Sequence, residues 1–243
     1  MNGKVALVTG GSRGIGAATA LRLAEDGADV AFTYRTGEKE AAAVLEGIEA
    51  TGRRGLAVRA DAGDPEAAAD AVERTVRELG RLDVLVNNAG VGVLGPLEEL
   101  TTADVEHVLA VNVRGVFLTT RAAAPRLGAG GRILTIGSCM TQRVPGPGGT
   151  LYAMSKSALT GLTKALAREL GGRGITANIV HPGPVDTDMN PADGPYAGPQ
   201  AALTALGRFG TPREVAAVVS FLAGPDAAYV TGAEFSVDGG HAA

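Results

Sequence analysis

The sequence of 243 residues has one cysteine, Cys139, no tryptophan, and only three scattered histidines. A single cysteine cannot close a disulfide within the chain, which is typical of proteins from a reducing compartment. Zinc sites are built from clustered cysteine and histidine ligands, and the sequence has no paired ligands of that kind. We therefore expect no intramolecular disulfide and no metal site.

The sequence also lacks long apolar runs and any excess of basic residues. No run approaches the roughly 18 apolar residues of a membrane span, and the chain opens on a strand pattern in place of a signal peptide. The formal net charge is -4, and the 22 lysines and arginines are scattered. These absences predict a cytoplasmic protein that binds neither membrane nor nucleic acid and takes a small-molecule substrate.

Glycine, with 36 residues, is abundant, and short apolar runs alternate with amphipathic segments along most of the chain. We predict strands at 5–9, 29–34, 55–60, 83–86 and 132–137, and helices at 15–26, 38–51, from 65, at 103–127, 151–170 and 212–223. Such alternation predicts an α/β fold with a single doubly wound parallel sheet and helices on both faces. The length fits one domain, residues 1–243.

A glycine-rich segment follows the first strand and leads directly into a helix. Its candidate ligand-binding residues are Gly10, Ser12, Arg13, Gly14, Ile15 and Gly16. Strand, glycine loop and helix in this order place backbone amides and a positive helix end where a pyrophosphate can bind. The spacing is not the G-x-G-x-x-G of the better-known dinucleotide motif, and the alternative is a turn that only reverses the chain.

The end of the second strand distinguishes between the two nicotinamide cofactors. NAD sites usually carry an acidic residue there to bind the ribose hydroxyls, but this strand is followed by Arg35, with no carboxylate before Glu38. Arg35 and Arg13 together match a 2'-phosphate in charge and geometry. We therefore expect NADP(H), with NAD(H) as the less favoured cofactor. The alternative for each arginine is simple solvation.

Two further strand ends carry polar or small residues suited to a cofactor site. Asp61 and Ala62 follow the third strand, where the carboxylate could meet an adenine edge or serve only as a turn former. Asn88, Ala89 and Gly90 follow the fourth strand and could line the cofactor trough. Because parallel strands end at one edge of the sheet, these residues are expected near the glycine-rich segment.

The strongest candidates for chemistry are Tyr152 and Lys156, four residues apart on a predicted helix and therefore on the same face. A free phenol titrates near about 10, and an adjacent cation would lower its pKa toward neutrality. Ser138 lies at the end of the fifth strand, where open α/β sheets bind their ligands. Asn112 stands in an apolar helical stretch, where its amide makes either a structural bond or part of a polar relay.

Together, the glycine-rich segment, the Asn87–Gly90 run, Asn112, Ser138 and the Tyr152/Lys156 pair resemble the short-chain dehydrogenase/reductase family. The resemblance covers nearly the whole chain and extends to the β-ketoacyl carrier-protein reductases. It implies a Rossmann-like sheet of about seven strands, ending at Val237 to Gly240. It also implies contacts to the nicotinamide end of the cofactor from Pro182, Gly183, Val185 and Thr187.

The same resemblance implies that Tyr152 is the acid/base and that Ser138 orients the carbonyl. It implies that Lys156 binds the ribose and lowers the phenol pKa, and that Asn112 positions a water. Two departures stand out. Fourteen residues separate Ser138 from Tyr152 where thirteen are common, which places an extra residue in the loop 144–150, and Cys139 replaces a frequent second serine.

The segment 184–210 breaks the alternation, and the resemblance implies that it is a substrate lid. Its three aspartates would repel an anionic substrate, or only keep the loop soluble. The helix carrying Tyr152 is apolar on more than one face, which predicts a homo-oligomer, a tetramer in preference to a dimer. The predicted function is an NADP(H)-dependent ketone reductase or alcohol dehydrogenase; the alternative is a non-catalytic dinucleotide sensor. A serine hydrolase is excluded because Ser138 lacks flanking Gly-x-Ser-x-Gly glycines.

Overall fold

The computed structural model describes residues 1–243 and contains one seven-stranded sheet in the order β3-β2-β1-β4-β5-β6-β7. All neighbouring strands are parallel. The strands are β1 (Val5–Val8), β2 (Asp29–Tyr34), β3 (Gly55–Arg59), β4 (Leu82–Asn87), β5 (Leu127–Ile136), β6 (Thr176–Pro182) and β7 (Glu234–Val237). The predicted doubly wound, Rossmann-like α/β fold of about seven strands is confirmed.

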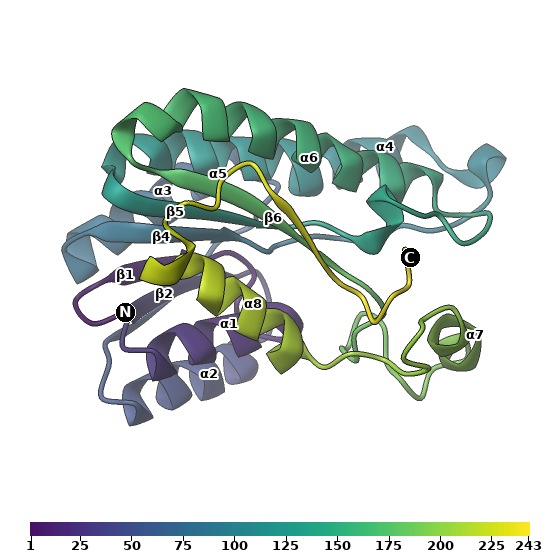
Figure 1. Cartoon of the computed structure of the whole chain (residues 1–243), viewed down its shortest axis with the longest axis horizontal. Coiled ribbons are helices and arrows are strands. Elements are labelled where there is room, and N and C mark those ends of the chain that lie inside the picture. The colour runs from purple at the N-terminus through teal and green to yellow at the C-terminus, as the bar shows by residue number, and fades with distance from the viewer.

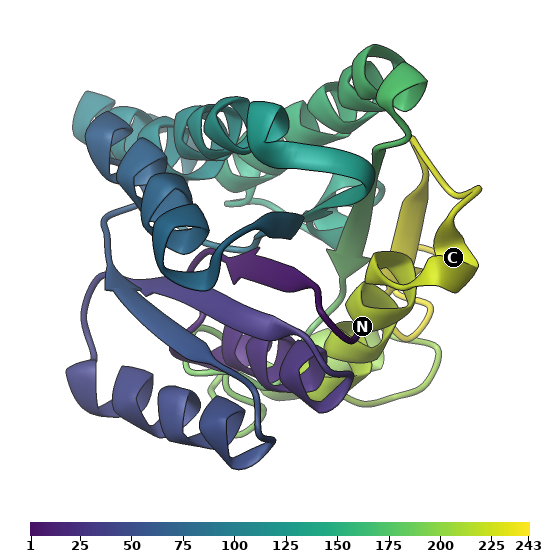
Figure 2. The same ribbon diagram turned by 90° about the vertical axis from the view of Figure 1, so that its left-hand side faces the viewer.

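Helices cover both faces of the sheet, as Figures 1 and 2 show. They are α1 (Gly14–Glu25), α2 (Glu38–Ala50), α3 (Pro65–Leu79), α4 (Thr102–Leu109), α5 (Val116–Ala123), α6 (Thr150–Leu170), α7 (Ala197–Ala202) and α8 (Pro212–Ala223). Helices α1, α2 and α8 lie on one side, and α3, α5 and α6 lie on the other. Helix α7 lies apart from both layers. None of the helices combines the length and apolar character that crossing a membrane requires.

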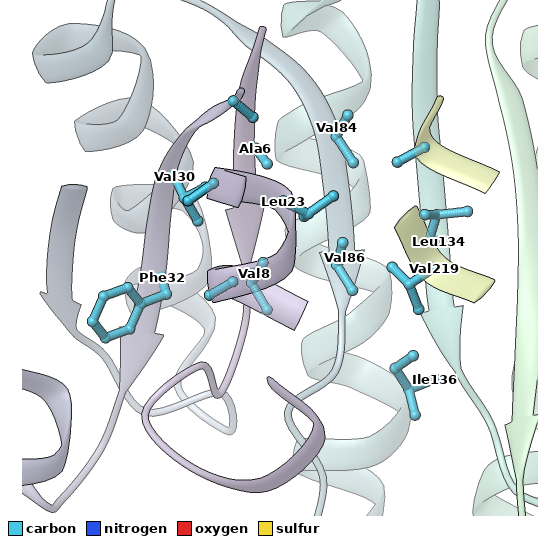
Figure 3. Close-up of a cluster of buried hydrophobic side chains, with 14 of the residues drawn as sticks. Ala6, Val8, Leu23, Val30, Phe32, Val84, Val86, Leu134, Ile136 and Val219 are labelled. Carbon is cyan, nitrogen blue, oxygen red and sulfur yellow. The ribbon is translucent and has the colours of Figure 1, made fainter. Parts of the chain in front are cut away.

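Both faces of the sheet are buried because apolar residues occupy successive positions of the central strands. In β1, Ala6 and Val8 face the layer of α1 and α8, whereas Val5 and Leu7 face α3 and α5. Figure 3 shows the apolar core between the sheet and helices α1 and α8. Side chains alternate across a strand, so a strand buried on both faces is a continuous apolar run. The sheet is thereby held rigidly, with its carboxyl ends free to form a site.

Three predicted helix starts are confirmed by their capping bonds. The Asp64 carboxylate accepts a hydrogen bond from the Glu66 amide at 2.9 Å and opens α3. Thr101 forms a capping box with Asp104 at α4, and Thr211 forms another with Glu214 at α8. Such caps satisfy amides that have no partner inside the helix.

The predicted helix at 103–127 is confirmed in extent, since the backbone is helical from Thr102 to Arg126, but it is not one regular α-helix. Helix α4 leads into a π-helix, Ala110–Gly115, then into α5, and a 3₁₀ turn, Ala124–Arg126, precedes β5. Pro125 has no amide hydrogen to continue the helix. Strand β5 begins at Leu127, earlier than the predicted residue 132, because Leu127 pairs with Leu82 before a bulge. The last strand likewise ends at Val237, with residues 238–240 in the turn that follows.

Candidate active site

A cavity of about 550 Å³ opens where the parallel strands end at their carboxyl side. Every predicted cofactor-contact residue lines it: Gly10, Ser12, Arg13, Gly14, Ile15, Gly16, Arg35, Asp61, Ala62, Asn88, Ala89, Gly90, Tyr152, Lys156, Pro182, Gly183, Val185 and Thr187. The topology thus brings together residues separated by most of the chain. That each one contacts a cofactor stays a prediction.

The glycines of the first loop meet two different requirements. Gly10 and Gly14 have positive φ values of +66° and +54°, a conformation that disfavours other residues. At Gly16 the backbone is ordinary, but a Cβ atom would collide with the Gly10 carbonyl oxygen and the Asn88 side chain. The loop is therefore packed tightly against the residues that follow β4. A turn that only reversed the chain would not need this close packing.

Thr9 directly follows β1 and was not assigned to the site from the sequence. It connects the end of β1 to the residues that follow β4. Its hydroxyl accepts hydrogen bonds from the amides of Asn88 and Ala89, both at 3.0 Å. The Asn88 side chain in turn donates to the carbonyl oxygens of Thr9 and Gly10, both at 2.9 Å. Asn88 therefore shapes the glycine loop. The sequence signal that could have identified Thr9 is a polar residue at the end of the apolar run Val5–Val8.

The two predicted phosphate-binding arginines are only loosely paired. Arg35 lies 3.9 Å from Asp61, and Arg13 lies 3.8 Å from Asp188 and donates to the Thr36 hydroxyl at 3.3 Å. Both side chains are more than half exposed, at 54% for Arg13 and 58% for Arg35. Exposed ion pairs at such distances contribute little stability. Both guanidinium groups are therefore free to bind an anion in the cavity.

Asp61 has the turn-forming role, and its predicted contact with an adenine edge stays a prediction. One carboxylate oxygen accepts a hydrogen bond from the Gly63 amide at 2.9 Å, which is the turn-forming role. The residue also lines the cavity next to Ala62. The carboxylate is therefore fixed by its own turn at the edge of the cavity.

Tyr152 and Lys156 lie on one face of α6, as their spacing predicts. The Lys156 ammonium group is buried, lies 5.9 Å from the centre of the Tyr152 ring, and donates to the Ile136 carbonyl oxygen at 3.0 Å. Burial lowers the pKa of Lys156 to about 8. An ammonium group has three donors, so Lys156 retains hydrogen-bonding capacity toward the cavity.

The pKa of Tyr152 differs from the expectation. It is raised, because burial disfavours the phenolate, and the Ser138 hydroxyl acts in the opposite direction. Lys156 makes no hydrogen bond to the phenol and does not account for a lowered pKa. The distance from the ammonium group and its own lowered pKa weaken the electrostatic effect that the four-residue spacing suggested.

Ser138 directly follows β5 and has an extended backbone, with φ -164° and ψ 147°. Its hydroxyl oxygen accepts a hydrogen bond from the Met140 amide at 3.2 Å, which orients the group beside Tyr152. Cys139, at the position of the frequent second serine, is buried, and burial raises the pKa of its thiol to about 11. The thiol is therefore not activated.

Asn112 is fully buried in the π-helix and uses its side chain for structure. Its amide oxygen accepts from the Val91 amide at 2.8 Å. Its amide nitrogen donates to the Val91 carbonyl at 2.9 Å and to the Ser155 hydroxyl at 3.0 Å. The residue thus connects the segment after β4 to Ser155 of α6, the residue before Lys156. The predicted water-positioning role stays a prediction.

The loop 144–150, where the extra residue is expected, lies outside the cavity lining and is joined to a segment that contacts Tyr152. The Gly95 amide donates to the Gly148 carbonyl oxygen at 2.9 Å, joining this loop to the segment after β4. Gly92 in that segment lies against the Tyr152 ring. In the segment 184–210, Asp186 accepts a bond from the Ala192 amide at 2.9 Å, so this aspartate has a structural partner.

Comparison with known proteins agrees with this geometry. The family model described as enoyl-(acyl carrier protein) reductase matches residues 10–242. A crystal structure of a short-chain dehydrogenase from Burkholderia cenocepacia in complex with NADP has 54% sequence identity and a TM-score of 0.99, and covers 100% of this chain and 99% of that one.

Two curated relatives cover nearly the whole chain. The cyclic-di-GMP-binding biofilm dispersal mediator protein of Escherichia coli is 47% identical over 98% of this chain and 96% of its own length. The 3-oxoacyl-[acyl-carrier-protein] reductase of Synechocystis is 40% identical over 99% of this chain and 97% of its own length. With the glycine loop, Tyr152 and Lys156 brought to one cavity and Ser138 beside Tyr152, these matches show that the chain belongs to the short-chain dehydrogenase/reductase family.

Proposed function

We propose that the protein is an NADP(H)-dependent oxidoreductase that transfers a hydride between nicotinamide and a ketone or secondary alcohol, with Tyr152 as the acid/base. The observation that carries the proposal is one cavity lined at one place by Arg13 and Arg35 and at another by Tyr152 and Lys156. The first pair suits a nucleotide phosphate, and the second pair suits proton transfer.

The residues of the cavity fit the cofactor. Lys156 is a buried cation without a carboxylate partner, which suits the hydroxyl groups of a ribose. The amides of the glycine loop at the start of α1 suit a pyrophosphate. The two loosely paired arginines suit a 2'-phosphate, and no acidic residue stands between the end of β2 at Tyr34 and Glu38 to favour NAD. When bound, the cofactor would supply or accept the hydride.

The proton chemistry belongs to three side chains. In the reductive direction, the Ser138 hydroxyl donates a hydrogen bond to the substrate carbonyl, and the Tyr152 phenol delivers its proton to the same oxygen. Lys156 stabilises the phenolate that this leaves, because a cation favours the charged form. In the oxidative direction the phenolate accepts the proton. Burial keeps the phenol protonated until substrate and cofactor arrive.

The segment 184–210 is proposed as the substrate lid. Thr187, Asp188, Met189 and Asn190 line the cavity, and the side chains of Asn190 and Gln200 exchange two hydrogen bonds, at 2.9 and 3.0 Å. This exchange ties the cavity edge to α7. Closure of such a segment would exclude water from the reacting groups.

A homo-oligomer, with a tetramer preferred, is part of the proposal. Phe117 on α5 and Met154 on α6 are about half exposed, and the α6 residues Ala158, Gly161 and Ala165 are exposed at helical spacing. Small residues allow two helices to approach closely, and a second copy would cover the apolar surface.

A cytoplasmic location is also part of the proposal. The buried, unactivated Cys139 thiol fits the predicted reducing compartment.

The test is Tyr152→Phe, which removes the proton but keeps the ring. It should bind NADPH with a Kd within about twofold of wild type, measured by cofactor fluorescence, and lose about 10²- to 10⁴-fold in kcat. A Tyr196→Phe variant, in the exposed lid segment, is the matched control. Near-normal turnover in Tyr152→Phe would refute the assignment.

The substrate class is addressed by measuring oxidation of NADPH and NADH with a panel of ketones, including a short β-ketoacyl thioester. The Escherichia coli relative is named for binding cyclic di-GMP, which makes the sensor alternative concrete. A sensor has no need of Ser138, Tyr152 and Lys156 together, so we favour catalysis. Cofactor binding without turnover of any carbonyl in the panel would favour the sensor.

A further inference from the structure

His181 is a fully buried histidine (0% exposed) in β6, one residue before Pro182 of the cavity wall. Its two ring nitrogens contact different parts of the molecule. Nδ1 lies 3.2 Å from the amide nitrogen of Ser138, and Nε2 lies 3.2 Å from a carboxylate oxygen of Glu234 on β7. The ring therefore connects the proposed reaction centre to the edge strand of the sheet.

The Ser138 amide needs this partner because the sheet ladder ends just before it. The last paired residues of β5 and β6 are Ile136 and Val180, and the Gly137 amide still donates to the Val180 carbonyl at 2.7 Å. A buried amide without an acceptor is destabilising, because it has given up its hydrogen bond to water. Nδ1 of His181 supplies the acceptor that no strand provides.

The contacts also determine which ring nitrogen carries the proton. A backbone amide can only donate, so Nδ1 accepts from Ser138, and the ring proton lies on Nε2, where it donates to Glu234. The Thr141 hydroxyl also lies 3.2 Å from Nδ1, but its single proton is directed at the Ser138 carbonyl oxygen at 2.9 Å. Burial lowers the pKa of His181, which keeps the ring neutral at pH 7.

Glu234, the partner of the His181 ring on β7, is itself paired with a second lysine of α6, Lys164. Lys164 Nζ lies 2.8 Å from the other carboxylate oxygen of Glu234, and this bond lowers the pKa of that carboxyl group. The charged groups acting on the ring are thus Glu234 from β7, which raises its pKa, and Lys156 from α6, which lowers it. An ionised Glu234 fixes the orientation of the ring.

Gly137, the residue before Ser138, lies so close to the His181 ring that only glycine fits there. A Cβ atom on Gly137 would collide with Nδ1 of His181 and would lie 2.8 Å from Cε1. Gly137 has no positive φ that would otherwise require glycine. The backbone therefore approaches the imidazole closely at this point, and the strand end and the ring are packed as one unit.

We propose that His181 is a positioning residue, which holds the Ser138 amide and thereby sets the position of the Ser138 hydroxyl relative to Tyr152. Glu234 and Lys164 act through it by fixing the ring tautomer. This inference rests on the proposed function, because it assigns Ser138 a part in carbonyl binding. A misplacement of about 1 Å in a positioning group can cost about 10²-fold in rate.

The experiment compares three variants with NADPH and the best ketone of the panel. His181→Leu removes the acceptor and should lower kcat about 10- to 100-fold, with the Kd for NADPH nearly unchanged. His181→Asn places an amide oxygen near the Nδ1 position and should recover most of that loss. Asn178→Ala, which removes buried bonds of β6 to residues 230 and 233, is the control for stability alone; it should lose melting temperature but not kcat.

The pH profile gives a signature that a merely structural role would not produce. As pH falls through the lowered pKa of His181, Nδ1 gains a proton and can no longer accept from Ser138, so kcat should fall on the acid side. Glu234→Gln removes the carboxylate that raises this pKa, so the acid limb should move to lower pH. In His181→Asn the limb should vanish.

A reading without turnover comes from ¹⁵N NMR of the wild-type imidazole rings, with His107→Asn and His181→Asn for assignment. At pH 7 His181 should be neutral with its proton on Nε2; a proton on Nδ1, or a charged ring, overturns the inference. Wild-type kcat and pH profile in His181→Leu overturn it as well. If Tyr152→Phe remains active, the proposed function itself fails; if only the histidine variants behave like wild type, the inference alone fails.

Discussion

The Lys156 ammonium group is buried against the carbonyl oxygen of Ile136, at 3.0 Å, and no carboxylate neutralises it. Burial of an unpaired cation disfavours folding, because the charged form loses its hydration. The protein thus retains a destabilising charge at the position where the proposed function requires one, which is a common property of active sites.

The first prediction is that Lys156→Met stabilises the free protein while weakening NADPH binding at least tenfold. The pKa of Lys156 in the folded protein, about 8, lies below its ordinary value of 10.5, which corresponds to a cost of up to roughly 3 kcal/mol at pH 7. Between these two values the unfolded chain binds more protons, so wild-type stability rises with pH there. The gain of the variant should therefore shrink toward pH 10.5.

Urea unfolding at pH 7 and pH 10, without cofactor, measures this difference. Lys164→Met is the matched control, since this lysine on the same helix is exposed and paired with Glu234. A wild-type protein more stable than Lys156→Met at pH 7 would contradict the prediction.

The second prediction concerns the choice of cofactor. Arg13→Ala and Arg35→Ala should each raise the KM for NADPH about 10- to 100-fold, since a hydrogen bond to a charged group contributes about 1.5–3 kcal/mol. The KM for NADH should change little. Arg59→Ala is the control, because Arg59 pairs with Glu38 and does not line the cavity. Equal effects on both cofactors would argue against a 2'-phosphate at this place.

The third prediction compares a glycine that is closely surrounded by other atoms, Gly16, with one that has open space around it, Gly198. Gly16→Ala should lower stability by about 1–3 kcal/mol and weaken NADPH binding, because its Cβ would collide with the Gly10 carbonyl and the Asn88 side chain. Gly198→Ala, in α7 with open space around it, should leave the melting temperature unchanged or slightly higher. Calorimetry of the two variants decides this, and a harmless Gly16→Ala would be the contrary outcome.

The fourth prediction is that a charge on the exposed face of α6 breaks the oligomer. Ala158→Arg should convert the proposed tetramer into smaller species in sedimentation equilibrium at micromolar concentration, because it places a charge and a long side chain among small apolar residues. Ala43→Arg makes the same change on the exposed side of α2 and should have no effect. A wild-type monomer under these conditions would sink the oligomer proposal.

Much of the fold was predictable because its signals are local. The strand Asp29–Tyr34 and the helix starts at Pro65 and Pro212 follow from apolar runs and capping residues adjacent in sequence. The cavity lining was predictable for a related reason, since parallel strands deliver their carboxyl-end residues to one edge. The resemblance to a known family supplied the predicted roles of Ser138 in orienting a carbonyl and of Lys156 in binding a ribose, which their positions alone do not give.

The errors arose where distant contacts override local preference. The π-helix around Asn112 depends on partners at Val91 and Ser155, which lie far away in the sequence. The early start of β5 depends on pairing with Leu82, since residues 128–131 show no apolar run. The contacts of His181 with Ser138 and Glu234 were invisible for the same reason.

The sheet order places β1 and β4 side by side at its centre, with the first three strands on one side and the last four on the other. The two arginines belong to the first group, while Ser138, Tyr152 and Lys156 follow or lie between strands of the second. Under the proposed function, nucleotide preference and carbonyl chemistry are encoded in separate stretches of the gene. A crossover between homologues in the connection from β3 to β4 would exchange one property while leaving the other as inherited.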